Sequence, residues 1–317
     1  MRAVFLDTDS LDPGDLDRRA LEACSADWTF FGETRPDQVP ERIAGAEVVV
    51  TNKVPLDARV LRNAGGLRLV CIAATGTNNV DLAAARERDV AVANVVRYAT
   101  PSVVQHVFSL MLALTTRLSD YEQSVRSGRW AESPHFCLLD FPIRELAGRT
   151  LGVVGHGELG SNVAHVAEAF GMRVRVAQIP GRPDRPERVA LGRLLPEVDV
   201  LTLHCPLTPE TEGLLGAGEL ERLPDHALLI NTARGGIVDE PALAEALRAG
   251  RLGGAGVDVL TREPPPPDHP LLAPDIPNLI LTPHVAWASR EARQRMVEEL
   301  AANIEAFGRG ESRNRVA

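Results

Sequence analysis

Residues 150 to 181 constrain the fold of this chain more than any other stretch. They contain an apolar run at Thr150–Val154, the glycine-rich sequence Gly155-His156-Gly157-Glu158-Leu159-Gly160, a helix-like stretch that ends near Phe170, and a second apolar run at 172–177. A strand, a glycine turn, a helix and a strand in this order are typical of the first βαβ unit of a dinucleotide-binding sheet. The sequence therefore predicts a parallel sheet that binds a nucleotide cofactor.

Each glycine of this turn has a physical role in that interpretation. Gly155 permits the tight turn, Gly157 leaves room for a pyrophosphate to approach the backbone, and Gly160 lets the helix pack closely on the strand. The N-terminus of the helix then offers N–H groups to the phosphates. The alternative interpretation is an ordinary glycine-rich turn between a strand and a helix.

The end of the second strand departs from the usual pattern. An acidic residue normally stands there and binds the ribose hydroxyls of NAD. In this chain the position falls on Gln178, and Arg182 and Arg185 follow within a few residues. Glutamine can bond a hydroxyl but does not repel a 2′-phosphate. The predicted cofactor is therefore NAD, with NADP possible.

Composition narrows the function classes. The chain has 317 residues, enough for about two domains, and a net charge of −9, which argues against a nucleic-acid binder. No apolar run approaches the ~20 residues of a membrane span, and the N-terminus has the pattern of a first strand. Four cysteines lie far apart without a CxxC motif, which predicts reduced thiols in a cytoplasmic protein and no metal site.

Strand and helix patterns alternate along both halves of the chain. This alternation predicts two doubly wound parallel-sheet α/β domains, with helices on both faces of each sheet. A helix that opens at Thr100-Pro101 is apolar on more than one face, so we expect it to be buried between domains or between subunits. The last helix, at 289–307, has helical apolar spacing and is expected to pack back onto the N-terminal domain.

Polar residues follow two strands of the first half. Lys53 stands just after one strand, and Thr75-Gly76 begin a polar turn after the next. Ligands gather at the carboxyl ends of strands in open α/β sheets, and turn N–H groups can hold a carboxylate. The alternatives are a solvated lysine and a simple polar turn. For His106, on the apolar helix, a core histidine is the preferred interpretation.

Three charged or titratable residues follow strands of the second half. They are Arg234, Glu263 and His284. Arginine binds a carboxylate in a bidentate manner, and histidine is the acid–base residue that titrates near neutral pH. A carboxylate beside the histidine favours its imidazolium form. Because parallel strands end at one edge of a sheet, the three can meet at a site suited to reducing a 2-keto acid.

The motifs together resemble those of the D-isomer-specific 2-hydroxyacid dehydrogenases. The resemblance rests on the glycine turn, Asn231-Thr232-Ala233-Arg234-Gly235-Gly236, Gly256-Val257-Asp258-Val259, Glu263-Pro264 and Thr282-Pro283-His284. Residues 51–56, 74–78, 135–137 and 287–289 are similar to those of the glycerate dehydrogenases, also called hydroxypyruvate reductases. The resemblance covers essentially the whole chain.

The resemblance implies a Rossmann cofactor domain at 100–284, a flavodoxin-like substrate domain at 1–99 plus 285–317, a cleft between them and a homodimer. It implies that Arg234 binds substrate, that His284 is the acid and base, and that Glu263 pairs with His284. Lys53, Thr75, Gly76, Arg234 and His284 would contact the substrate. The cofactor contacts would be Gly155, Gly157, Glu158, Leu159, Gly160, Gln178, His204, Cys205, Pro206, Thr232, Ala233, Arg234, Asp258 and His284.

Other functions on this fold stay open at this point. One is a non-catalytic NAD-sensing interaction protein, and another is a formate or phosphonate dehydrogenase. The favoured function is hydride transfer between a nicotinamide cofactor and a D-2-hydroxy acid or 2-keto acid. D-glycerate and hydroxypyruvate are the expected substrates, with glyoxylate as a further one.

Overall fold

Two separate parallel sheets organise the chain in the computed structural model, which describes all residues from Met1 to Ala317. Unit 1 contains Met1–Ser102 and Trp287–Ala317, and unit 2 contains Val103–Ala286. Each unit has its own hydrophobic core. The fold class predicted from the sequence, two parallel-sheet α/β domains, is confirmed.

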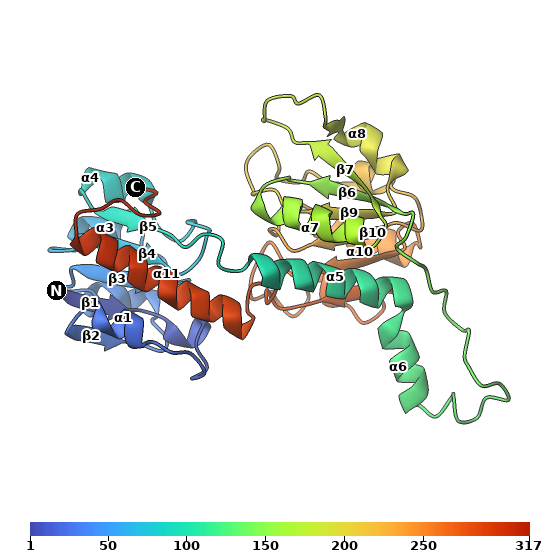
Figure 1. Cartoon of the computed structure of the whole chain (residues 1–317), viewed down its shortest axis with the longest axis horizontal. Coiled ribbons are helices and arrows are strands. Elements are labelled where there is room, and N and C mark those ends of the chain that lie inside the picture. The colour runs from blue at the N-terminus through green and yellow to red at the C-terminus, as the bar shows by residue number, and fades with distance from the viewer. The chain divides into compact units, whose positions relative to one another are not determined.

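The sheet of unit 1 has five parallel strands in the order β2-β1-β3-β4-β5 (Figure 1). This is the strand order of flavodoxin-like folds. Strands β3 and β4 are buried along their whole length because parallel sheets are covered on both faces. The elements are β1 Arg2–Phe5, α1 Arg19–Ala23, β2 Asp27–Phe30, α2 Val39–Arg42, β3 Val48–Thr51, α3 Ala58–Asn63, β4 Leu69–Ile72, α4 Leu82–Glu87, β5 Ala91–Ala93 and α11 Arg290–Gly308.

The end of the chain completes unit 1. Helix α11 packs against α1 and β4, and both termini lie in this unit (Figure 1). The Val92 N–H donates to the carbonyl of Ala317 at 3.0 Å, and the Val316 N–H donates to the carbonyl of Val92 at 2.8 Å. Residues more than 200 positions apart are therefore joined in one sheet-and-helix layer.

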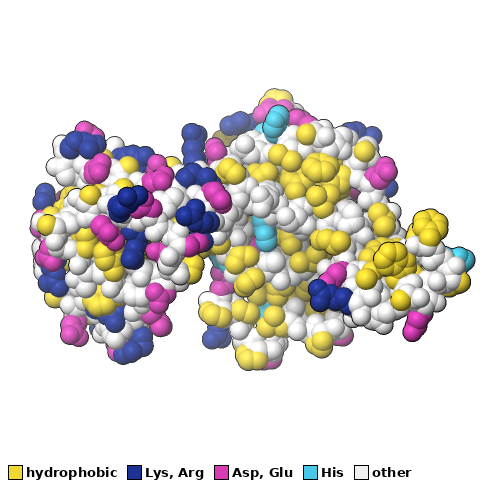
Figure 2. Space-filling model, turned by 60° about the horizontal axis from the view of Figure 1, so that its bottom comes forward, with side chains coloured by type: hydrophobic (Ala, Val, Ile, Leu, Met, Phe, Trp, Pro, Cys, Tyr) yellow, Lys and Arg dark blue, Asp and Glu magenta, His cyan; other side chains and the backbone are white.

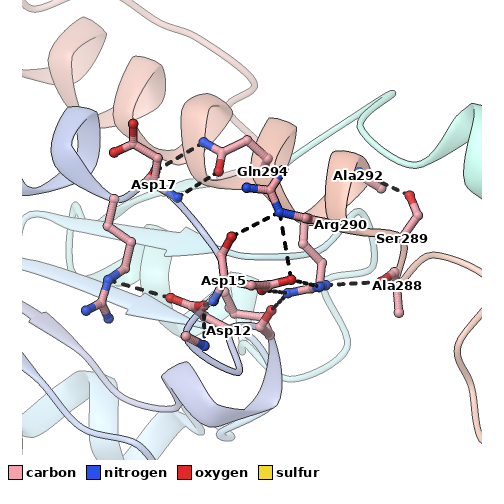
Figure 3. Close-up of polar contacts among 12 residues, drawn as sticks. Asp12, Asp15, Asp17, Ala288, Ser289, Arg290, Ala292 and Gln294 are labelled. Atoms are coloured by element: carbon pink, nitrogen blue, oxygen red, sulfur yellow. Dashed lines mark hydrogen bonds and ion pairs between the residues drawn. The ribbon is translucent and has the colours of Figure 1, made fainter.

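Polar contacts fix the start of α11 against the segment that follows β1 (Figure 3). Ser289 caps the helix, since its hydroxyl accepts from the Ala292 N–H. Arg293 donates to both oxygens of Asp15, at 2.7 and 2.8 Å, and this pairing lowers the pKa of Asp15. Gln294 both donates to and accepts from the backbone of Asp17. The helix thus has one defined register on unit 1.

The sheet of unit 2 has seven parallel strands in the order β12-β11-β10-β9-β6-β7-β8. Counted from β6, this order is 7-6-5-4-1-2-3, which contains the Rossmann order. The elements are α5 Thr100–Thr116, α6 Leu118–Arg126, β6 Thr150–Val154, α7 Glu158–Ala169, β7 Arg173–Gln178, β8 Val189–Ala190, α8 Leu191–Leu194, β9 Val200–Leu203, α9 Ala217–Leu220, β10 Leu228–Asn231, α10 Glu240–Arg248, β11 Gly254–Val257 and β12 Leu279–Leu281.

The apolar helix α5 is covered by the sheet of its own unit. A Cβ atom at Gly256 of β11 would lie 2.9 Å from the Cβ of Leu110, and one at Gly254 would lie 3.2 Å from Leu114. Glycines in β11 therefore let α5 lie directly on that strand. The helix does not need a second subunit to bury these side chains, so its apolar pattern is not the evidence for a dimer that the sequence suggests.

Helix α6 and the irregular segment after it extend away from the sheet of unit 2 (Figure 1). We call residues 118–143 the arm. The sequence analysis missed α6, because only a few of its residues are apolar. It also missed β2, a four-residue edge strand that begins with Asp27 and is only partly buried. Short edge strands lack the continuous apolar run that identifies central ones.

Candidate active site

The glycine turn between β6 and α7 has the geometry that the motif predicts. Gly155 has a φ of +99°, and a Cβ there would lie 2.5 Å from the backbone nitrogen of Cys205. A Cβ at Gly160 would lie 1.9 Å from the carbonyl oxygen of Gly155, so α7 can approach the turn only because residue 160 is glycine. Nothing lies within 4 Å of a Cβ at Gly157, and no side chain caps α7. This open N-terminus fits a pyrophosphate.

Three buried polar atoms without a hydrogen-bond partner lie at the carboxyl ends of β7, β9 and β10. They are Oε1 of Gln178, Nδ1 of His204 and Oγ1 of Thr232. Buried polar groups are normally paired, and an unpaired one costs free energy. The atoms belong to three strands of one sheet, on either side of the glycine turn after β6. A bound dinucleotide, rich in hydroxyls and amide groups, fits this set of residues.

Burial keeps the side chains of His204 and Cys205 uncharged. His204 forms a 2.9 Å hydrogen bond with Thr202 through Nε2, and burial lowers the pKa of His204 to about 4. The imidazole is therefore neutral at neutral pH. Burial also raises the pKa of the Cys205 thiol to about 11, so Cys205 remains protonated and does not act as a thiolate.

Gln178 has a second role that the sequence did not reveal. Its Nε2 donates to the carbonyl oxygens of Ile179, Arg182 and Pro183, at 3.3, 2.9 and 3.1 Å. This orientation of the amide is the one that places a donor among three acceptors. The side chain thus holds the loop after β7, and only its oxygen is left for a ligand.

The two residues predicted as the acid–base pair lie near the β12 edge of the sheet. His284 follows β12 and Glu263 lies in the loop after β11, and His284 Nδ1 is 2.6 Å from Glu263 Oε2. The second oxygen of Glu263 accepts from the Leu260 N–H at 2.9 Å. Since a carboxylate only accepts, Nδ1 carries the proton of this hydrogen bond. Nε2 is then the ring nitrogen of His284 that does not face Glu263.

Asp258 fixes the turn that presents His284. Its buried carboxylate accepts from the N–H groups of Val285 and Ala286, each at 2.9 Å, and from the hydroxyl of Thr282 at 2.5 Å. His284 itself has a φ of +54°, a left-handed conformation that costs energy for a residue with a side chain. These hydrogen bonds stabilise that conformation. A contact of Asp258 with the nicotinamide stays a prediction.

His106 is part of the same hydrogen-bond network. Its Nε2 lies 3.0 Å from the hydroxyl oxygen of Thr282 and 3.5 Å from Oδ1 of Asp258. Because the Thr282 hydroxyl donates to Asp258, it must accept from His106 Nε2. The preferred interpretation of His106 as a core histidine is compatible with these contacts, but no sequence pattern could reveal a partner 176 positions away.

Arg234 lies in the turn after β10 and is half-buried. The Asn231 side chain shapes this turn, since its Oδ1 accepts from the Ala233 N–H and its Nδ2 donates to the Arg234 carbonyl. A Cβ at Gly235 would lie 1.9 Å from the backbone carbon of Leu260, so the turn of Arg234 contacts the backbone beside the Glu263 loop. Pro206, in the loop after β9, is exposed.

The carboxyl edge of the sheet in unit 1 carries the remaining predicted residues. Lys53 is exposed just after β3, and its turn is held by Asp7, whose buried carboxylate accepts from the N–H groups of Asn52, Lys53 and Val54. Burial raises the pKa of Asp7, and these hydrogen bonds oppose that rise. The role of Asp7 was not predicted from the sequence, because Asp7 directly follows the apolar run of the first strand.

Thr75 and Gly76 lie in the turn after β4 of unit 1. The Thr75 hydroxyl donates to the Val95 carbonyl at 2.7 Å, and Asn94 Nδ2 donates to the Thr75 carbonyl at 2.8 Å. These hydrogen bonds hold the turn at the carboxyl end of β4. No group of three or more His, Cys, Asp or Glu side chains in the chain could hold a metal ion. No helix is long and apolar enough to cross a membrane.

The Rossmann sheet, the glycine turn and the histidine–glutamate pair define a dinucleotide-dependent oxidoreductase. A family model described as the D-isomer specific 2-hydroxyacid dehydrogenase, NAD binding domain, matches residues 108–286. The chain belongs to the D-isomer-specific 2-hydroxyacid dehydrogenase family, as its motifs predict, and it contains the family's NAD-binding domain.

Relatives and solved structures agree with this assignment. The chain is 44% identical over 306 residues to a glycerate dehydrogenase of Methylorubrum extorquens, covering 94% of this chain and 96% of the relative. It is 36% identical to a hydroxypyruvate reductase of Blautia hydrogenotrophica, covering 98% of each. The crystal structure of the TT0316 protein from Thermus thermophilus matches with a TM-score of 0.86, 37% identity and full coverage of both chains. An acyclic imino acid reductase in complex with NADPH and D-Arg matches with a TM-score of 0.87, 26% identity and full coverage of both chains.

Proposed function

We propose that this dehydrogenase interconverts hydroxypyruvate and D-glycerate, with glyoxylate as a second substrate and NADH as the preferred cofactor. The hydrogen bond of 2.6 Å between His284 and Glu263 carries the proposal, because it orients a histidine for proton transfer at the carboxyl edge of the cofactor sheet. The names of the relatives support the choice of substrate. When bound, the reduced nicotinamide supplies a hydride for the carbonyl carbon of the keto acid.

The residues of the chain supply the other half of the reaction. The imidazolium form of His284 donates its Nε2 proton to the carbonyl oxygen, so the keto acid gains a hydride and a proton and becomes the hydroxy acid. In the reverse direction, neutral His284 removes the hydroxyl proton. Glu263 accepts from Nδ1 and stabilises the imidazolium. Arg234 binds the substrate carboxylate through its guanidinium.

Unit 1 carries further residues that we propose as substrate contacts. Lys53 contributes a positive charge, and the turn at Thr75-Gly76 contributes backbone N–H groups to the carboxylate. The hydrogen bonds of Asp7 and Thr75 support this role, because they hold both turns in one conformation. The substrate domain would then be unit 1 and the cofactor domain unit 2. Four free cysteines support a cytoplasmic location.

Initial rates test the proposed activity. Hydroxypyruvate, glyoxylate, pyruvate and phosphohydroxypyruvate are each assayed with NADH and with NADPH, and formate and phosphite are assayed with NAD⁺. We expect the highest kcat/KM with hydroxypyruvate and NADH. No turnover with any keto acid, or turnover of formate or phosphite alone, would overturn the proposal.

We also propose that the protein is a homodimer joined through the arm. The arm contains Leu118, Val125, Trp130, Phe136, Leu139 and Ile143, six of the twelve large hydrophobic side chains that are exposed. Phe136 is 91% exposed and Leu139 is 84% exposed. Figure 2 shows apolar side chains gathered on the projecting segment at the right. Soluble monomers rarely expose so much apolar surface in one place, and a second copy of the arm is a self-complementary partner.

Sedimentation tests this assembly. The wild-type chain should sediment as a dimer at micromolar concentration, and the double variant Phe136→Asp, Leu139→Asp should sediment as a monomer. Leu272→Asp, at an exposed apolar residue outside the arm, is the matched control and should remain a dimer. A monomeric wild-type protein, or a dimer that survives both arm substitutions, contradicts the proposal.

A further inference from the structure

The loop that carries Glu263 is held by a second carboxylate that lies away from His284. Glu240, the first residue of α10, is buried, and its Oε1 accepts from the Thr261 N–H at 2.6 Å and from the Thr261 hydroxyl at 2.9 Å. Thr261 is adjacent to Leu260, whose N–H donates to Glu263. Two carboxylates therefore fix consecutive N–H groups of the same loop.

His269 completes this arrangement from the far end of the loop. Its Nε2 lies 2.9 Å from Oε2 of Glu240, and its Nδ1 accepts from the Leu271 N–H at 3.2 Å. Because Nδ1 is an acceptor, the proton of the neutral ring is on Nε2 and donates to Glu240. The side chains of His269 and Glu240 are only 8% and 9% exposed. A buried hydrogen bond of this kind is strong and directional.

The position of Leu260 and Thr261 also matters for Arg234. The backbone of Leu260 lies so close to Gly235 that no Cβ fits between them. A shift of Leu260 would therefore disturb the turn of Arg234 and the hydrogen bond to Glu263 together. The Glu240–His269 pair makes no hydrogen bond to Arg234 or Glu263. It fixes the backbone at Thr261, next to Leu260, on which the positions of Arg234 and Glu263 depend.

We propose that Glu240 and His269 are positioning residues for the 2-hydroxyacid dehydrogenase site. They hold the loop so that Glu263 meets His284 Nδ1 and the turn of Arg234 keeps its place. This inference rests on the proposed function, since it concerns the turnover of the same site. Sequence analysis gave no sign of it, because His269 follows a proline-rich loop and Glu240 looks like a residue that favours the helix dipole.

Two substitutions of His269 separate its two hydrogen bonds. In His269→Gln, the side-chain nitrogen can reach the place of Nε2 and still donate to Glu240. In His269→Asn, the side-chain oxygen can replace Nδ1 as the acceptor for Leu271, but the hydrogen bond to Glu240 is lost. The proposal predicts that Asn lowers kcat for hydroxypyruvate reduction by about tenfold or more, while Gln stays within about threefold of the wild type. The KM for NADH should be unchanged in both.

Melting temperatures keep this comparison interpretable. His269→Asn that melts earlier but turns over normally would overturn the proposal, and so would equal losses of kcat in both variants. The same substitution in the Glu263→Gln background gives a second test. Because part of the effect of His269 passes through Glu263, His269→Asn should lower kcat there by less than it does in the wild-type background, since residues that act as a unit are not additive. A loss as large as in the wild-type background would refute the inference.

The two hypotheses fail in different ways. Absence of keto-acid reduction by the wild-type protein would reject the proposed function. Reduction by the wild type, its loss in His284→Ala and normal kcat in His269→Asn would reject only the positioning role.

Discussion

The carboxyl edges of the two sheets are completed differently. In unit 1, polar side chains at the edge are bonded to the backbone of neighbouring segments, as Asp7 is to residues 52–54 and Thr75 is to Val95. In unit 2, Gln178, His204 and Thr232 each leave one buried polar atom without a partner. The contrast teaches that these polar groups of unit 1 are satisfied on folding, whereas the edge of unit 2 keeps unpaired atoms that a ligand would fit.

The largest effect should come from removing the acid–base group of unit 2. His284→Ala should lower kcat for keto-acid reduction by roughly 10²–10⁴-fold, the usual contribution of general acid–base catalysis. The affinity for NADH, measured by fluorescence titration, and the melting temperature should change little, because the proposed role of His284 is proton transfer to the substrate. Near-normal turnover would remove His284 from the catalytic role.

Gln178→Glu tests the loop beside the cofactor. The carboxylate removes the donor to three carbonyl oxygens and places negative charge among them. We expect the protein without cofactor to lose about 1–3 kcal/mol of unfolding free energy, the cost of unpaired buried groups. Denaturation by urea measures it. Gln178→Met, of similar length and uncharged, is the control and should lose less. An unchanged stability in Gln178→Glu would show that the amide does not hold this loop.

A pair of matched threonine substitutions tests the comparison most directly. Thr232→Val removes an unpartnered buried hydroxyl, so it should leave the stability of the free protein unchanged or raise it by about 1 kcal/mol. It should also weaken NADH binding several-fold. Thr75→Val removes a hydroxyl that donates to Val95, so it should lower stability by about 0.5–1.5 kcal/mol. Stability changes of the same sign in both variants would break the distinction between the two edges.

The last effect concerns pH. The folded-state pKa of His204 is about 4, below its ordinary 6.5, so the unfolded chain binds a proton that the folded chain does not. This residue should therefore lower stability as pH falls from about 6.5 towards 4, with no further loss below that range. The melting temperature of wild type minus that of His204→Asn, followed from pH 7 to pH 4, isolates the contribution. A difference that is constant with pH contradicts a buried neutral His204.

The sequence predicts those parts of the site that depend on residues close together in the chain. The glycine turn is legible because Gly155, Gly157 and Gly160 serve one short loop, and the parallel sheets follow from alternating apolar runs. Glu263 and His284 could be placed at one edge because parallel strands end together. All of these follow from local patterns and from one topological rule.

The residues that the sequence could not reveal act through distant partners. Asp7 holds a turn 45 positions away, His106 bonds to Thr282, and His269 bonds to Glu240. Each looks ordinary in its own segment, and only the folded chain brings the pairs together. The sequence predicts a cofactor contact for Gln178, but its three hydrogen bonds to the following loop depend on a backbone path that prolines and a glycine make hard to predict.

The course of the chain has a consequence for its biosynthesis. Unit 2 is one uninterrupted stretch, Val103–Ala286, so it can fold as soon as the ribosome has released it. The first part of unit 1 is synthesised before unit 2, but unit 1 cannot finish folding at that stage. Strand β5 forms hydrogen bonds with Val316 and Ala317, and β4 packs against α11, and these segments are synthesised last. During translation, the strands of unit 1 are therefore left with an open apolar face while about 200 further residues are made. A nascent chain stalled before residue 290 should accordingly be a good substrate for chaperones that bind exposed apolar strands.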